Sequence, residues 1–114
     1  MSIGRQLRND ERDLIAAMLR GKLSHTELLT SLNVPTVEDM QDGGMGSIRF
    51  TGNGVGRRHL GGAIAQAEYT DDDGVLVSIV LNTDTSGGLY EVDFWKVDFS
   101  RLVRYPSPSD LRIK

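Results

Sequence analysis

The sequence contains no cysteine, which excludes a disulfide framework, thiol catalysis and thiolate metal sites. Its continuous apolar runs are short, so we expect no membrane-spanning helix. Residues 1–7 hold no apolar stretch typical of a signal peptide. The lack of cysteine also fits a reducing compartment. We therefore expect a cytoplasmic protein.

The composition is that of an ordinary soluble globular chain. It has 114 residues, of which 39% are apolar and 25% charged, and its net charge is −3. A chain of this length fits one domain, residues 1–114, that buries enough surface to fold unaided.

The first third of the chain predicts two helices. Residues 9–20 place an apolar stripe at helical spacing, with Asn9 as the cap and Gly21 as the stop. Ser24 and Glu27 form the pattern of a capping box ahead of Leu28. Together these helices predict a helical hairpin at about residues 9–33.

From residue 36 onward the apolar period changes to two, which predicts strands. We expect strands near residues 47–51, 58–69, 75–81 and 89–99. The last one has apolar residues on both faces, so we expect a bulge at Phe94–Trp95 and place Trp95 in the core. The fold class expected is α+β: an N-terminal helical hairpin packed on an antiparallel meander of four to five strands (about 36–100), with an irregular tail at 101–114.

Two glycine-rich segments are candidate binding loops. Asp42, Gly43 and Gly44 begin the first, which ends at Ser47 and reads as a tight turn or as a place where a partner backbone approaches closely. The second carries glycines at 52, 54 and 56 and ends in Arg57, Arg58 and His59. His59 stands where a dinucleotide-binding fingerprint needs its third glycine, and no phosphate-loop lysine follows. This favours a plain loop with a basic end.

Residues 82–93 match the spacing of a calcium-binding loop in part. Asp84 is at position 3 and Gly87 at position 6, but Asp93 replaces the bidentate Glu at position 12 and the flanks alternate like strands. A hairpin loop is the favoured interpretation. Asp71, Asp72 and Asp73 cannot all converge on one cation from an extended chain, so a solvated turn is favoured there. We predict no metal and no cofactor.

The sequence gives little support to catalysis. It contains no G-x-S-x-G nucleophile elbow. A carboxylate pair of Asp93 and Asp98 would be five residues apart, so on a regular strand the two side chains would face opposite ways. An enzyme is the less favoured interpretation.

The charge distribution is more informative. Residues 68–100 hold eight acidic residues and one basic residue, Lys96, which is a balance of 1 − 8 = −7, whereas residues 101–114 carry +3. Such a region repels nucleic acid and attracts cationic partners, or it only keeps the protein soluble. Tyr90, Trp95 and Tyr105 are candidate anchors within it.

Several motifs together resemble a small bacterial family classed as a domain of unknown function. They are Arg8-Asn9-Asp10-Glu11, Asp42-Gly43-Gly44-Met45-Gly46-Ser47, Asp72-Asp73-Gly74, Leu89-Tyr90-Glu91-Val92-Asp93 and Trp95-Lys96-Val97-Asp98-Phe99-Ser100. The resemblance covers about residues 5–106 and implies no particular activity. Small acidic α+β proteins are also similar, as a class only, to immunity proteins that neutralise toxins.

The sequence therefore favours a non-enzymatic interaction module, immunity-like in kind, whose acidic β-surface binds a basic protein partner and neither nucleic acid nor membrane. The alternative is a small enzyme or ligand-binding protein that uses the turn from Gly43 to Gly46 with Arg57, His59 and nearby acids. A third hypothesis is a divalent-metal binder through Asp84 and Asp93. The candidate binding residues are Asp42, Gly43, Gly44, Arg57, Arg58, His59, Asp72, Asp73, Tyr90 and Asp93.

Overall fold

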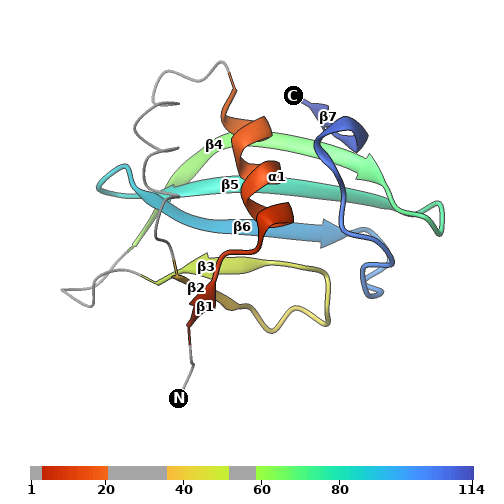
Figure 1. Ribbon diagram of the computed structural model, residues 1–114, viewed down its shortest axis with the longest axis horizontal. Coiled ribbons are helices and arrows are strands. Elements are labelled where there is room, and N and C mark those ends of the chain that lie inside the picture. The colour runs from red at the N-terminus through yellow and green to blue at the C-terminus, as the bar shows by residue number, and fades with distance from the viewer. Residues whose placement is uncertain (1–3, 21–35, 52–58) are drawn as a thin grey trace.

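A computed structural model describes residues 4–20, 36–51 and 59–114. These residues form one antiparallel sheet of seven strands in the order β1-β2-β3-β6-β5-β4-β7, and one α-helix, α1 (Figure 1). The elements are β1 (Arg5–Gln6), α1 (Asn9–Leu19), β2 (Thr36–Asp39), β3 (Ile48–Phe50), β4 (Leu60–Thr70), β5 (Leu76–Asp84), β6 (Leu89–Lys96), a 3₁₀ turn η1 (Pro108–Asp110) and β7 (Arg112–Ile113).

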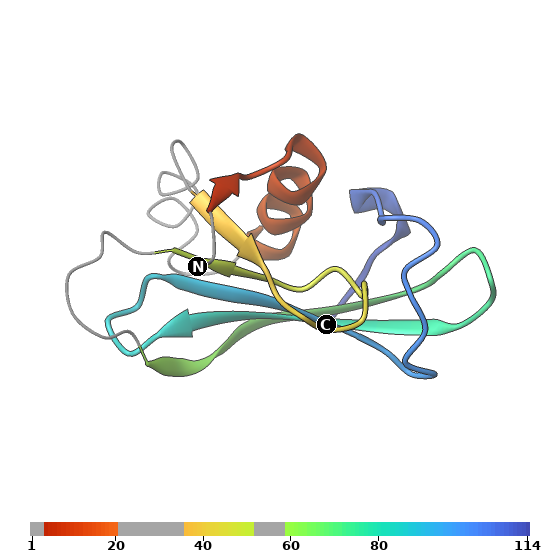
Figure 2. The ribbon, with the colours of Figure 1, turned by 90° about the horizontal axis from the view of Figure 1, so that it is seen from below.

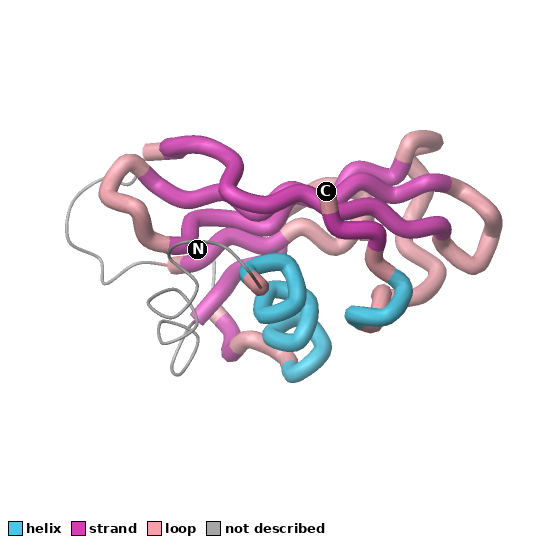
Figure 3. The backbone as a smooth tube through the Cα atoms, turned by 90° about the horizontal axis from the view of Figure 1, so that it is seen from above, coloured by secondary structure: helices cyan, strands magenta, loops and turns pink. Residues whose placement is uncertain are grey.

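Helix α1 packs against one face of the sheet, and the C-terminal segment crosses the same side (Figure 2). No described helix or strand covers the opposite face, which we call the open face (Figures 2 and 3). The core lies between α1 and the sheet. Leu14, Ile15 and Met18 of the helix are fully buried with Ile79 and Val92 of the central strands.

Helix α1 begins where the sequence predicts, but Asn9 is not the cap. Arg8 is the N-cap, and its backbone N–H donates to Glu11 Oε1 at 2.9 Å. Glu11 is fully buried, and both of its carboxylate oxygens also accept from Arg5, at 2.9 and 2.8 Å. Arg5 reaches Asp39 of β2 as well, at 2.7 Å. This ion-pair cluster ties the start of the helix to β1 and β2.

The expected fold class is wrong in its architecture. The structure is mostly β, with seven strands instead of four or five, and the described residues hold a single α-helix. The sheet is not a simple meander either. Strand β3 pairs with β6, and β5 and β6 separate it from β4, the next strand in the chain. The second expected helix, at 24–33, lies outside the described residues. The tail is not wholly irregular, since it contains η1 and β7, which pairs with β4.

Strand β6 also differs from its prediction. Phe94 and Lys96 point into the core while Trp95 between them is exposed, so the alternation runs unbroken through Phe94–Trp95. The irregularity lies nearer the start of the strand, where Asn82 pairs with Glu91 and Thr83 pairs with Leu89, which leaves Tyr90 as the extra residue.

Among the described residues, no helix is long and apolar enough to cross a membrane.

Candidate functional site

Three segments meet at one end of the sheet. They are the turn between β2 and β3 (40–47), the turn between β4 and β5 (71–75) and the chain that leaves β6 (97–105). Half of the candidate residues predicted from the sequence lie here: Asp42, Gly43, Gly44, Asp72 and Asp73.

Asp42 organises the turn that the sequence singled out. Its carboxylate accepts the backbone N–H of Met45 at 3.1 Å and of Ser47 at 2.8 Å. Gly43, Gly44 and Gly46 have positive φ angles of 75°, 83° and 107°, which glycine adopts readily. The glycine loop thus wraps around the side chain of Asp42. The aspartate and the glycines of this segment have a structural role in forming the turn.

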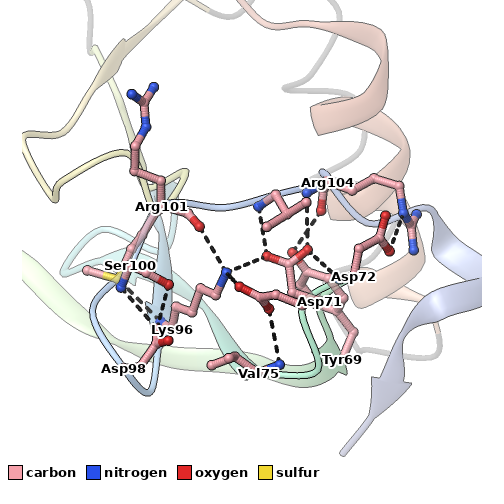
Figure 4. Close-up of polar contacts among 12 residues, drawn as sticks. Tyr69, Asp71, Asp72, Val75, Lys96, Asp98, Ser100, Arg101 and Arg104 are labelled. Carbon is pink, nitrogen blue, oxygen red and sulfur yellow. Dashed lines mark hydrogen bonds and ion pairs between the residues drawn. The ribbon is translucent and has the colours of Figure 1, made fainter.

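Lys96 is the centre of a buried polar cluster (Figure 4). Its side chain is fully buried, and its Nζ donates to Asp71 at 2.9 Å, to Asp73 at 2.6 Å and to the carbonyl of Arg101 at 2.9 Å. The Asp71 carboxylate also accepts the backbone N–H groups of Val103 and Arg104. Every donor of the ammonium thus has an acceptor, and the cluster fastens the chain at 101–104 to the sheet.

The solvated turn expected at 71–73 is therefore only partly correct. Asp71 is buried, and Asp73 bonds both Lys96 and the backbone N–H of Val75. Asp72 and Asp73 are both exposed, and Asp72 pairs with Arg104 at 2.9 Å. Asp71 and Asp73 both bind the buried Lys96, so a charge reversal at Asp73 would disrupt this cluster and would not simply change a free surface.

The negative balance of residues 68–100 is largely neutralised within the protein. Counting only partners that the structure describes, five of its eight acidic residues form ion pairs with Lys or Arg. The pairs are Glu68 with Arg112 and Lys114, Asp71 and Asp73 with Lys96, Asp72 with Arg104, and Glu91 with Arg49. Among the other acidic residues of this segment, Asp93 and Asp98 form no ion pair with a lysine or arginine that the structure describes.

Exposed apolar side chains gather at this end of the open face. Trp95 is 49% exposed and Phe99 is 62% exposed, and their rings meet edge to face with centroids 4.9 Å apart. The exposed Leu76 lies beside Val97, whose backbone N–H donates to the Leu76 carbonyl. We call Leu76, Trp95, Val97 and Phe99 the aromatic patch. Phe99 has a φ of 64°, a conformation that is unfavourable for a residue with a bulky side chain.

Two carboxylates without a cationic partner flank the aromatic patch. Asp93 lies two residues before Trp95 on the same face of β6, and Asp98 lies between Val97 and Phe99 in the chain. Neither forms an ion pair with a lysine or arginine of the described residues. Partial burial raises the pKa of Asp93, and the negative charges of Glu91 and Asp42 raise it further. The serine that follows, Ser100, donates two hydrogen bonds to Asp98 and lowers its pKa.

His59 and Tyr90 lie at the other end of the sheet. His59 precedes β4, and its carbonyl accepts the N–H of Thr85. Asp93 of β6 lies opposite Val80 of β5, which in turn lies opposite Gln66 of β4. Gln66 is seven residues from His59, so roughly 20 Å of strand separates His59 from the level of Asp93 in the sheet. His59 therefore cannot join Asp42 and Asp93 in one pocket. Arg57 and Arg58 lie outside the described residues.

The calcium-loop interpretation fails on geometry. Asp84 Oδ1 accepts the N–H groups of Ser86 and Gly88, and Gly87 has a φ of 88°, so the segment is the hairpin loop favoured from the sequence. Asp93 lies opposite Val80, four residues back along β5, so Asp84 and Asp93 do not converge. No group of three or more metal-ligating side chains occurs within the described ranges. Tyr90, at the same end, has the guanidinium of Arg49 over its ring, 5.4 Å from the centroid.

A cleft of about 340 Å³ lies on the helix side of this region. Arg8, Met40, Gly46, Leu102 and Tyr105 line it, together with Asp39 and Asp42. Both carboxylates are already engaged, Asp39 with Arg5 and Asp42 with its own turn. The cleft therefore offers a ligand few uncommitted polar groups.

Residues 4–106 match a family model described as a domain of unknown function, DUF6984. No curated protein and no solved structure matches the chain. The match agrees with the resemblance seen in the sequence, and it includes the Asp42 turn, the turn before Val75 and strand β6. Because it spans most of the chain, the protein belongs to the DUF6984 family.

Proposed function

We propose that the protein is a non-enzymatic interaction module that binds a basic protein partner at the aromatic patch on the open face of its sheet. An immunity-like role is one form of this function. The single observation that carries the proposal is the exposure of Trp95 and Phe99 side by side. Asp93 and Asp98 are next to them in the chain and have no cationic partner in the part of the chain that the structure describes.

The patch has the composition of a protein-binding site. Large aromatic residues anchor interfaces because they bury much area at a low cost in conformational entropy. A cluster of exposed apolar side chains costs solubility, and proteins keep such clusters where something covers them. The strained φ of Phe99 points the same way, because strained backbone tends to occur at functional sites.

The negative charges next to the patch indicate that the partner's surface is positively charged. Burial raises the pKa of Asp93, and the negative charges of Glu91 and Asp42 raise it further. A cationic surface would relieve this repulsion and would be attracted from a distance. A nucleic acid or an acidic protein would meet like charge at the same place.

The enzyme or ligand-binding alternative receives less support. The structure separates His59 from the turn at 42–47, and that turn uses its own backbone N–H groups to hold Asp42. The cleft beside it has its carboxylates already paired. The geometry thus favours the open face over the cleft as the binding site.

A capture experiment tests the proposal. The immobilised protein should retain from the cells of its own organism an identified protein of net positive charge. The double variant Trp95→Ala/Phe99→Ala should lose this partner, whereas Val103→Ala, which removes an equally exposed apolar side chain outside the patch, should keep it. Association should slow as salt rises.

Three results would contradict the proposal. The first is a partner that the patch variant binds as well as the wild type does. The second is an identified partner of net negative charge. The third is the recovery of nucleic acid in place of a protein.

A further inference from the structure

Two arginines of this protein are held in the same way. The guanidinium of Arg49 lies over the ring of Tyr90, 5.4 Å from the centroid, and its Nη2 is 3.4 Å from the carboxylate of Glu91. The guanidinium of Arg8 lies over the ring of Tyr105, also at 5.4 Å, and its Nε donates to Asp10 at 3.1 Å. In each case the guanidinium lies over an aromatic ring and forms an ion pair with a carboxylate.

Strand β6 and the turn after it repeat the aromatic and acidic parts of this arrangement. Trp95 and Asp93 lie on one face of the strand, and Asp98 and Phe99 are adjacent in the chain. The rings of Trp95 and Phe99 are exposed and in contact. Within the described residues, neither ring has an arginine or lysine over it, and neither carboxylate has an ion-pair partner. The arrangement lacks only its cation.

We infer that the aromatic patch with Asp93 and Asp98 is an arginine-binding site, and that the arginine side chain belongs to the basic protein partner. This inference rests on the proposed function and specifies the group that the partner inserts. The guanidinium lies against the exposed ring of Trp95 and donates to the carboxylate of Asp93 or Asp98.

Arginine suits this site better than lysine does. The planar guanidinium stacks on an aromatic face and presents several N–H donors at its edge at the same time. A lysine ammonium is a compact, strongly hydrated charge that gains less from a ring. The free energy of one exposed cation–π contact is modest, so a single arginine should bind weakly and a partner would add further contacts.

The fluorescence of Trp95 reports directly on this site, because it is the only tryptophan in the chain. The probes are a short blocked peptide of alternating arginine and glycine and the same peptide with lysine in place of arginine. The arginine peptide should change the emission of Trp95 and bind about threefold or more tightly than the lysine peptide.

Charge-matched variants locate the contact. The variant Asp93→Lys should weaken binding of the arginine peptide by about tenfold. Asp98→Lys should weaken it equally, and this variant removes only the hydrogen bonds that Ser100 donates to Asp98. Asp13→Lys changes the net charge equally at an exposed position of α1, which covers the opposite face, and should have little effect. Circular dichroism verifies that each variant is folded.

Each contrary result overturns a distinct statement. Equal binding of the lysine peptide, or no change of Trp95 emission with the arginine peptide, overturns the arginine site. Equal weakening by Asp13→Lys overturns it as well, because the effect would then be one of net charge. The proposed function fails separately, when the captured partner ignores Trp95→Ala/Phe99→Ala. If that partner needs the patch but tolerates replacement of its arginines by lysine, the proposed function stands and the arginine site does not.

Discussion

At the scale of single residues, the burial of Lys96 and the exposure of Trp95 determine which side chains form the candidate site. Both faces of the segment from Tyr90 to Phe99 carry large apolar side chains, so hydrophobicity alone cannot decide which face is buried. The decision comes from residues far away in the chain. Lys96 goes inside because Asp71 and Asp73 provide its acceptors, and this leaves Trp95 in solvent.

The variant Asp71→Asn tests the importance of the Lys96 cluster. Both carboxylate oxygens of Asp71 accept hydrogen bonds, from Lys96 and Val103 on one and from Asp72 and Arg104 on the other. An amide would place an NH₂ group against one set of donors and leave a buried ammonium with one counter-charge fewer. We expect a loss of about 3 kcal/mol in the free energy of unfolding, measured by urea denaturation.

The neighbouring Asp72→Asn is the matched control. Asp72 is half-exposed and makes only a surface ion pair with Arg104, so its loss should cost about 1 kcal/mol at most. If the two variants lost equal stability, the buried cluster would have no special role.

The stability of the protein should also depend on pH through Asp71. Burial works to raise the pKa of this carboxyl, but hydrogen bonds from the Val103 amide and Lys96 outweigh it, and the pKa is about 2 instead of 3.8. A carboxyl whose pKa is lower in the folded state stabilises the fold above its unfolded pKa and loses that effect as the pH falls. Stability should therefore drop between about pH 4 and pH 2. Urea midpoints across this range should fall less steeply in Asp71→Asn, and equal slopes would contradict the assignment.

At the scale of elements, the sequence predicts those parts of the fold that depend on local patterns. The apolar stripe locates α1, and the turn at Asp72-Asp73-Gly74 separates β4 from β5 as expected. The edge strands β1 and β7 have two residues each, too few for any periodicity. They are fixed by distant contacts such as Arg5 with Asp39 and Glu68 with Arg112. The pairing of β3 with β6 is equally non-local.

The glycine pair in β4 provides a test of the strand assignment. A Cβ on Gly61 would clash with the backbone carbonyl oxygen of Asp84, whereas a Cβ on Gly62 would meet no described atom within 4 Å. Gly61→Ala should thus force the end of β4 away from β5 and cost on the order of 1–3 kcal/mol. Gly62→Ala should change the thermal midpoint much less. The opposite order would show that the two strands do not pair in this register.

At the scale of the whole molecule, the charge of the chain and the charge of its surface are different quantities. The sequence balance of −7 for residues 68–100 suggested an acidic sheet, but ion pairs within the protein neutralise most of it. The sequence predicted Asp72, Asp73 and Asp93 as binding residues and placed Trp95 in the core, whereas Trp95 is exposed. The pairing of Asp72 with Arg104 and of Asp73 with Lys96 depends on how the tail crosses the sheet, which local patterns do not reveal.

The region of the protein that the partner covers is the most direct test of whether the binding site lies on the open face. Amide hydrogen exchange of the protein alone and with its captured basic partner should show added protection in β6 and the turn that follows it, at residues 93–99, and in β5 near Leu76. Helix α1 and the turn at 42–47 should exchange as before. Protection confined to that turn and to residues 102–105 would place the binding site in the cleft on the helix side and would contradict the assignment of the open face.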